Sequence, residues 1–265
     1  MKIMILYWFF SLPTFVSFII ITGFFPAFGL LGLYLSKKTF HKKLSYAQDR
    51  NDQVAFFMSV LGVFYGITLG LVAVGTWENF ESVQEKVTIE AATLGALYRD
   101  ISAMPEPIRG NLQHALKQYT HEVINQDWPL QQQGVVPKGA LNHLDVVQQT
   151  LYTFHPADAT QEILLGEAIG KFNELVMLRR MRVMSIGNGL PITIWLVSFV
   201  GALICISFFW FLVMEDYGIQ MTLTALCSFF IGTMIFLIVM MDNPYTGEIA
   251  ISTESFELVQ QELMK

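Results

Sequence analysis

The segment that follows residue 241 carries the residues best suited to bind a ligand, because it combines acids with turn formers. Carboxylate and carbonyl oxygens of this kind coordinate Ca²⁺, which takes about six to eight oxygen ligands. The simpler interpretation is a turn that ends a helix, since an Asn-Pro pair stops a helix and glycine permits positive φ. The spacing matches no recognised calcium loop, so we predict no firm metal site and keep Ca²⁺ as the one cofactor considered. The residues concerned are Asp242, Asn243, Pro244, Tyr245, Gly247, Glu248, Glu254 and Glu257.

A stripe of small residues marks the apolar segment 54–76. Gly62, Gly66 and Gly70 form two consecutive GxxxG steps, and Ser59 extends the stripe along the same region of the helix. Small side chains allow two membrane helices to approach closely, which is their common use in membrane proteins. We therefore predict that these four residues pack against another helix.

Larger apolar residues occupy the adjacent face of the same segment. Phe56, Val60 and Phe64 recur at i, i+4 and i+8, so they lie along one side of a helix. Apolar constrictions of this kind can gate a pore by dewetting. The alternative is that the three side chains face lipid, which is the usual place of aromatic residues at helical spacing.

Catalytic motifs are missing from the sequence. It contains no HExxH, GxSxG, GxxxxGK[ST] or GxGxxG pattern, and its five histidines are dispersed. The apolar segments hold no ionisable residue that could relay protons in a coupled transporter. We expect neither an enzyme nor an active pump, and we interpret Glu81, Glu85 and Glu90 as the exposed face of a helix.

Four apolar segments are long enough to place these residues in a lipid bilayer. Hydrophobic residues make up 53% of the 265 residues and charged residues only 14%, more than a soluble core of this size needs. A membrane-spanning helix takes about 20 apolar residues. We predict an interfacial lead-in at residues 3–10 and spans at about residues 12–35, 54–76, 190–214 and 219–241.

A polar region separates the second span from the third. From Phe80 to Tyr98 the apolar residues recur at helical spacing, and no alternating strand pattern follows. We predict further helices at about residues 106–127, 140–153 and 158–184, and hence an all-α polytopic membrane protein. Its predicted parts are residues 1–76, the first membrane pair; 77–188, a helical extramembrane domain; 189–241, a second membrane hairpin; and 242–265, a polar tail.

The charges limit the partners of the chain. With a formal net charge of -6 and no basic block, the chain has no footprint for nucleic acid. Two spans separate the extramembrane domain from each terminus, so all three lie on one side of the bilayer. Lysine and arginine occur in similar numbers beside the spans on both sides, and this leaves the orientation open.

Two stretches resemble the bestrophin anion channels. The run SVLGVFYGITLGLVAVGTW at residues 59–77 is similar to their second membrane helix in its order of Ser, Leu-Gly, Phe-Tyr, Thr-Leu and a terminal Trp. The run NPYTGEIAISTESFE at residues 243–257 resembles the Asn-Pro-Phe-Gly and acidic stretch after their fourth helix. As a whole, the chain resembles the bestrophin-like family of bacterial membrane proteins.

The resemblance implies a homo-oligomeric ion channel, a pentamer, in the bacterial inner membrane, with the second span lining its neck and anions favoured over cations. Phe64 matches an aromatic residue of the bestrophin neck, while Val60 and Phe56 fall where its other apolar rings lie. The acidic stretch is thinned here to Glu248, Glu254 and Glu257, so the resemblance does not extend to calcium gating.

A membrane-anchored sensor or scaffold is the alternative function. In that case the helical domain binds a partner or ligand, and the spans only hold and oligomerise it. The GxxxG stripe serves both functions equally. The two hypotheses differ in whether the second span borders water.

Overall fold

The computed structural model describes residues 12–38 and 48–265, and within these ranges it is helical and contains no strand. This confirms the predicted all-α class. The predicted lead-in at residues 3–10 lies outside the described residues. The chain divides into two compact units, one formed mainly by residues 80–188 and 243–265 and the other by the apolar helices.

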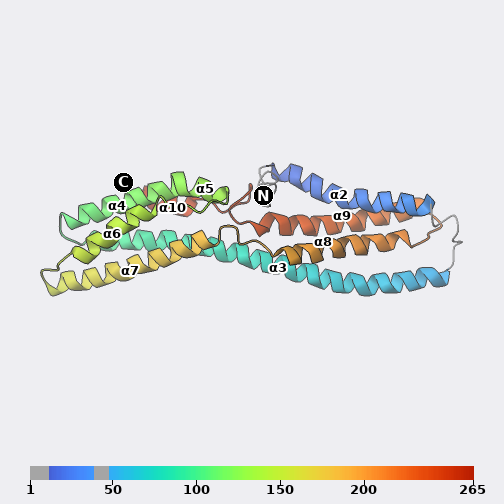
Figure 1. The fold of residues 1–265 in the computed structure, drawn as a ribbon, viewed down its shortest axis with the longest axis horizontal. Coiled ribbons are helices and arrows are strands. Elements are labelled where there is room, and N and C mark those ends of the chain that lie inside the picture. Colours follow the sequence, from blue (N-terminus) through green and yellow to red (C-terminus); the bar gives the residue numbers. More distant parts are fainter. Residues whose placement is uncertain (1–11, 39–47) are drawn as a thin grey trace. The chain divides into compact units, whose positions relative to one another are not determined.

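The apolar unit contains the four candidate membrane helices. All four are long and apolar enough to cross a bilayer, as predicted from the sequence. In Figure 1, α9 lies between α2 and α8. The helices are α2 (Thr14–Ser36), the first part of α3 (Gln48–Ile101), α8 (Ile192–Ser207) and α9 (Tyr217–Asp242).

Glycines allow α2 and α9 to pack closely. A β-carbon at Gly232 would lie 3.1 Å from the Thr22 Cα, and one at Gly29 would lie 2.7 Å from the Ser228 hydroxyl. Larger residues at these positions would separate the two helices. Buried apolar side chains fill the rest of this core, including Phe25, Ala202, Ile206, Ile235 and Ile238.

The third span is shorter than predicted. Its α-helix ends at Ser207, and a 3-10 turn covers Phe208–Trp210, whereas the sequence analysis extended the span to residue 214. The buried Gln220 amide donates hydrogen bonds to the carbonyls of Phe209 (3.2 Å) and Leu212 (2.6 Å). These carbonyls therefore have partners without a further helical turn.

The second span and the first helix of the domain are one element. The predicted span ends at residue 76, but α3 continues without interruption from Gln48 to Ile101. Residues 76–80 contain neither glycine nor proline, so nothing stops the helix where the composition turns from apolar to polar. We interpret the change in composition as the boundary between lipid and water, and the helix continues across it.

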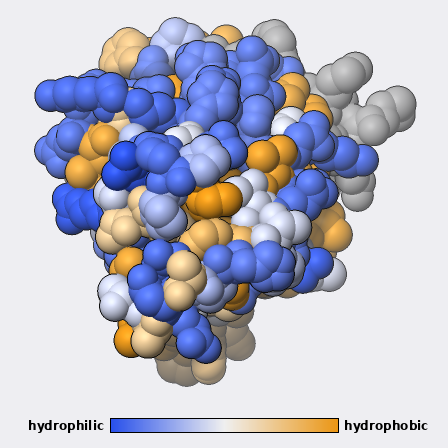
Figure 2. Space-filling view, turned by 90° about the vertical axis from the view of Figure 1, so that its left-hand side faces the viewer, coloured by the Kyte–Doolittle hydropathy of each residue, from blue (hydrophilic) through white to orange (hydrophobic). Residues whose placement is uncertain are grey.

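The second unit is a bundle of helices with a polar surface. Helix α7 begins at Asp158, whose carboxylate accepts a hydrogen bond from the Gln161 N–H (2.8 Å), as expected of an N-cap. Figure 2 views this unit end-on and shows a mainly hydrophilic surface. Besides the second part of α3, the unit contains α4 (Ile108–Glu122), the π-helix η2 (Val123–Asp127), α5 (Trp128–Gln132), α6 (Leu141–Thr153), α7 (Ala159–Met184) and α10 (Glu254–Leu263).

The tail contributes to the core of this unit. The sequence analysis predicted only a polar segment there, but Phe256 on α10 is fully buried, and Ile251 and Met264 are nearly so. They pack in one cluster with Val87, Leu94 and other buried residues of α3, α4, α6 and α7. Residues 243–265 are therefore an integral part of the domain.

Candidate functional site

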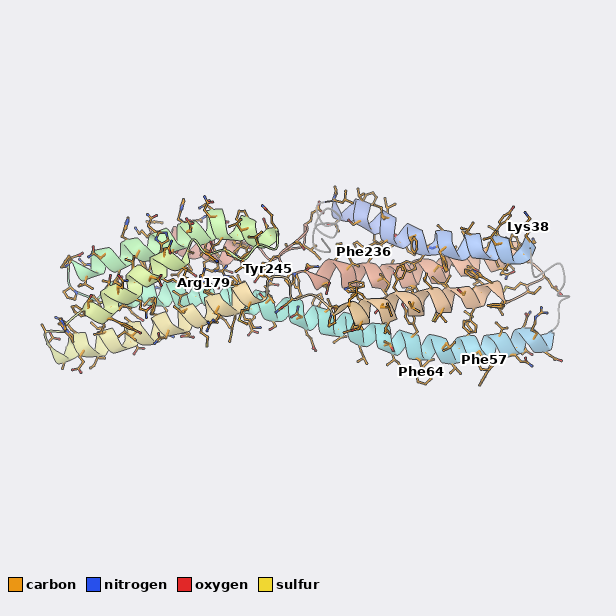
Figure 3. All side chains as sticks on the ribbon, viewed as in Figure 1. Lys38, Phe57, Phe64, Arg179, Phe236 and Tyr245 are labelled. Carbon is orange, nitrogen blue, oxygen red and sulfur yellow. The ribbon has the colours of Figure 1, made fainter. Side chains whose placement is uncertain are left out.

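The predicted pore residues lie on the open face of α3. Phe56 is 63% and Phe64 67% exposed within the single chain, and Phe64 points away from the neighbouring helices (Figure 3). The opposite face is packed, since Leu69 and Ala73 are buried. Val60 precedes Leu69 by nine residues, about two and a half helical turns, and so lies on the side opposite to it.

Two groups of hydrogen bonds fix the rotation of α3 in its unit. The Tyr65 hydroxyl donates to the carbonyl of Ser198 on α8 (2.9 Å). Near the start of the helix, the Asn51 amide donates to the Val213 carbonyl (2.7 Å) and accepts from the Val213 N–H (3.2 Å). Because Asn51 and Tyr65 face the bundle, the row of Phe56, Val60 and Phe64 faces outward.

The small-residue stripe has no partner within the described part of the chain. A β-carbon placed at Gly62, Gly66 or Gly70 would meet no atom within 4 Å there. The exposed Ser59 hydroxyl donates only to the carbonyl of Phe56, in its own helix (2.7 Å). Packing of this stripe against a second copy of the chain stays a prediction.

The segment after α9 forms a compact turn. The Thr246 N–H donates to the Asn243 carbonyl (3.1 Å), and the Ile251 N–H donates to the Pro244 carbonyl (2.9 Å). Gly247 has φ +89°, a conformation that favours glycine. The backbone of this turn is therefore largely engaged in its own hydrogen bonds.

Asp242 accepts hydrogen bonds from residues at the start of α8. Its carboxylate accepts hydrogen bonds from the Leu190 N–H (2.5 Å) and from the Trp195 indole N–H (3.3 Å). Leu190 lies just before the N-cap residue Pro191, and a negative charge near the start of a helix is stabilising. This role accounts for an acid at the end of an apolar span.

Tyr245 is anchored at the end of α7. Its hydroxyl lies 3.0 Å from the Ser185 hydroxyl and donates to the Arg182 carbonyl at 3.3 Å. Its ring packs edge-on against Trp128. Burial raises the pKa of Tyr245 to about 12. Tyr245, the aromatic residue of the segment Pro244–Gly247, thus binds the C-terminal end of α7 inside the domain.

The acids of the tail do not gather around one point. Glu257 accepts a hydrogen bond from the Thr253 hydroxyl (2.5 Å), and Glu254 is exposed. Within residues 12–38 and 48–265, no three histidine, cysteine or acidic side chains come together as metal ligands. Calcium binding stays a prediction that rests on the sequence alone.

Glu90 is not on the exposed face of α3, so that expectation is wrong. It is fully buried and forms a bidentate ion pair with Arg182 on α7, at 2.7 and 3.0 Å. The Tyr119 hydroxyl donates to the same carboxylate (2.8 Å). Glu90 follows Glu85 by five residues, a spacing that places it on a different side of the helix.

The surroundings of Arg182 and Tyr119 raise the pKa of both side chains. Burial alone would lower the pKa of Arg182, but the adjacent Glu90 carboxylate raises it above its ordinary value. Burial, and then the charge of Glu90, raise the pKa of Tyr119 well above its ordinary value. The ion pair was not predicted from the sequence, although Arg179 and Arg182 continue the buried row of Phe172 and Leu175 on α7 at helical spacing.

The comparisons with known proteins agree with this architecture. Residues 23–256 match the family described as Bestrophin-like domain. The chain is a member of the bestrophin-like family. Membership confirms the resemblance drawn from residues 59–77 and 243–257, and with the apolar helices it makes the chain an integral membrane protein.

Solved structures show the bestrophin-like fold at low sequence identity. A Klebsiella pneumoniae bestrophin homologue with one isoleucine-to-threonine mutation is 12% identical, with a TM-score of 0.69, and the match covers 94% of this chain and 100% of that chain. Another structure of a homologue from that organism is 13% identical, with a TM-score of 0.67 over 93% and 97% of the two chains. No curated protein matches the chain.

Proposed function

We propose that this protein is an oligomeric ion channel whose conduction path is lined by α3. The observation that carries the proposal is the open face of this helix. Only 6% of its most apolar stretch is buried within the chain, against 22% to 33% for the other three candidate spans. Phe56, Val60 and Phe64 lie on that face, opposite the buried Leu69.

A closed oligomer would give this face a physical role. Copies of α3 around a common axis would turn rings of apolar side chains toward the path, and such rings control permeation by dewetting. The stripe of Ser59, Gly62, Gly66 and Gly70 lies beside the apolar row, where a neighbouring subunit would approach closely.

The bestrophin-like family supports this proposal. The resemblance favours a homopentamer, anions as the permeant ions, a non-catalytic role and the bacterial inner membrane. These four properties come from the family resemblance. Lipid is the remaining partner, since the outer faces of α2, α8 and α9 are apolar and exposed.

A membrane-anchored sensor is the second candidate function. The observation that favours it is a group of buried polar side chains in the domain, around Arg179, whose nitrogen atoms lack hydrogen-bond partners among the described residues. Such a group could bind a ligand without any conduction by the spans. A protein that conducts no ions but binds a ligand in the domain would support this function.

Ion flux from liposomes that contain the purified protein tests the channel proposal. We expect flux of chloride or potassium that rises in Phe64→Ala, where the ring is removed, and falls in Phe64→Trp, where the neck is narrower. Phe230→Ala is the matched control, because Phe230 is equally exposed but lies on α9. No flux in any variant across pH, voltage and calcium conditions would contradict the channel.

A further inference from the structure

Tyr65 on α3 occupies the space that the missing side chain of Gly201 leaves on α8. A β-carbon at Gly201 would lie 2.6 Å from both Cδ2 and Cε2 of the Tyr65 ring. Carbon atoms in contact keep a distance of about 3.5–4.0 Å, so even a methyl group at residue 201 would push the ring away by about 1 Å. Glycine at this position therefore allows α3 to approach α8 as closely as it does.

The Tyr65 ring has little freedom to move aside. Its hydroxyl donates a hydrogen bond to the carbonyl of Ser198 on α8 (2.9 Å), about one helical turn before Gly201. The ring also packs against the buried apolar cluster of this unit, which includes Leu69 and Ala202. Because the far end of the ring is bound and its sides are packed, a displaced ring carries the backbone of α3 with it.

A push on Tyr65 from α8 moves the open face of α3 outward. Phe56 precedes Tyr65 by nine residues, about two and a half helical turns, and so lies on the opposite side of the helix. Phe64, the residue next to Tyr65, points away from the neighbouring helices (Figure 3). The row of Phe56, Val60 and Phe64 therefore moves away from α8 when the ring does.

We propose that Tyr65, seated against Gly201, is the positioning residue that sets the width of the channel neck. The inference rests on the proposed function, in which Phe56, Val60 and Phe64 line that neck. In a closed oligomer every copy of α3 would move toward the common axis. A shift of about 1 Å in each subunit, as carbon–carbon contact requires, narrows the neck by about twice that amount. An apolar neck conducts less as it narrows, because water leaves it.

Ion flux from liposomes that contain the full-length protein tests this inference through Gly201→Ala. We expect this variant to lose most of the flux of the parent protein, because the added methyl group pushes the apolar row into the path. Gly23→Ala is the matched control. It adds the same methyl group to the spanning helix α2, where a β-carbon would meet no atom of the described residues within 4 Å, so its flux should equal that of the parent.

A double variant separates a narrowed neck from a damaged fold. Phe64→Ala removes the ring that obstructs the path, so Gly201→Ala should lower the flux of the parent but not the flux of Phe64→Ala. A damaged fold would lower the flux in both backgrounds. An equal loss in the two backgrounds would therefore overturn the inference.

A second double variant tests the part of Tyr65 itself. Tyr65→Leu replaces the ring with a smaller side chain, which leaves room for a methyl group at residue 201. We expect Gly201→Ala to lower the flux less in this background than in the parent. A loss of the same size would show that Tyr65 does not position the neck.

The same experiment distinguishes this inference from the proposed function. An absence of flux in the parent protein and in Phe64→Ala contradicts the channel, and the inference with it. Flux that Phe64→Ala raises and Gly201→Ala leaves unchanged supports the channel and overturns only the role of Tyr65.

Discussion

At the scale of single residues, the buried ion pair of Glu90 and Arg182 is the feature on which we expect the stability of the domain to depend most. Both side chains are fully buried, and the pair joins α3 to α7 with support from Tyr119. A charge inside a protein is tolerated when it is paired and hydrogen-bonded. Removal of one partner therefore leaves an uncompensated charge in the core.

We expect Glu90→Gln or Arg182→Met to lower the free energy of unfolding by about 3–5 kcal/mol. The double variant Glu90→Gln/Arg182→Met should recover part of this loss, because neither charge is left alone. Thermal or denaturant unfolding in detergent measures the difference. Arg109→Gln, which breaks the exposed pair of Arg109 with Glu106, should leave the unfolding midpoint unchanged. Similar effects for buried and exposed pairs would refute this explanation.

Tyr245 makes a smaller and pH-dependent contribution. Tyr245→Phe keeps the ring against Trp128 but loses the hydroxyl contacts with Ser185 and Arg182, so we expect a loss of about 1 kcal/mol. The folded pKa of Tyr245 is raised to about 12 from about 10 in an unfolded chain. Its contribution is thus complete below pH 10 and is lost as pH rises toward 12. Parallel stability curves of the two proteins between pH 9 and pH 12 would contradict this assignment.

At the scale of elements, the open face of α3 changes from apolar to acidic along its length. Ile67, Leu71 and Val74 are followed by Glu78, Glu81 and Glu85 at steps of three and four residues, so all six lie on one side of the helix. The three glutamates are exposed. If α3 lines the path, their negative charges face the permeating ions and oppose the anion preference that the family suggests.

We therefore expect the triple variant Glu78→Gln, Glu81→Gln and Glu85→Gln to lower the permeability of potassium relative to chloride. Reversal potentials or paired flux assays under an ion gradient measure the ratio. Glu262→Gln, an exposed acid on α10, is the control for a change in net charge alone. An unchanged ratio in the triple variant would show that this face lies away from the ions.

Sequence periodicity predicted the presence of the helices better than the residues at which they end. The helical spacing and apolar lengths predicted the four spans and the domain helices, because each depends on local composition. The continuity of α3 and the early end of α8 were missed. Helix α3 continues because no residue breaks it, and beyond the end of α8 the carbonyls of Phe209 and Leu212 accept hydrogen bonds from the Gln220 side chain. These side-chain hydrogen bonds leave no trace in hydrophobic periodicity.

The sequence predicted which residues share a side of one helix, but not which residues meet across helices. Helical spacing within α3 puts Phe56, Val60 and Phe64 on one side of the helix, and the contacts of Asn51 and Tyr65 with other segments turn that side outward. The burial of Glu90 requires Arg182, which lies 92 positions away in the sequence. The roles of Asp242 and Tyr245 likewise depend on α8 and α7. The roles of Glu90, Asp242 and Tyr245 therefore depend on contacts between segments that are far apart in the sequence.

At the scale of the whole molecule, a pore lined by α3 requires more than one copy of the chain. The open face of α3 and the unpacked glycine stripe have no partner among the described residues, and a shared axis would supply one. We expect a single homo-oligomeric species in both detergent and lipid nanodiscs, with a mass near five chains as the family resemblance implies. Mass photometry measures it directly. A strict monomer in both environments would leave no axis for a pore.

The central claim is that the open face of α3 borders water inside the membrane. The direct test is the reaction of a charged, membrane-impermeant thiol reagent with single cysteines, in a background where Cys205 and Cys227 are replaced by alanine. We predict labelling at Phe56→Cys, Val60→Cys and Phe64→Cys, and none at Leu226→Cys on the exposed face of α9, which we expect to face lipid. An absence of labelling at all three α3 positions, under every condition of pH, voltage and calcium, would contradict the claim.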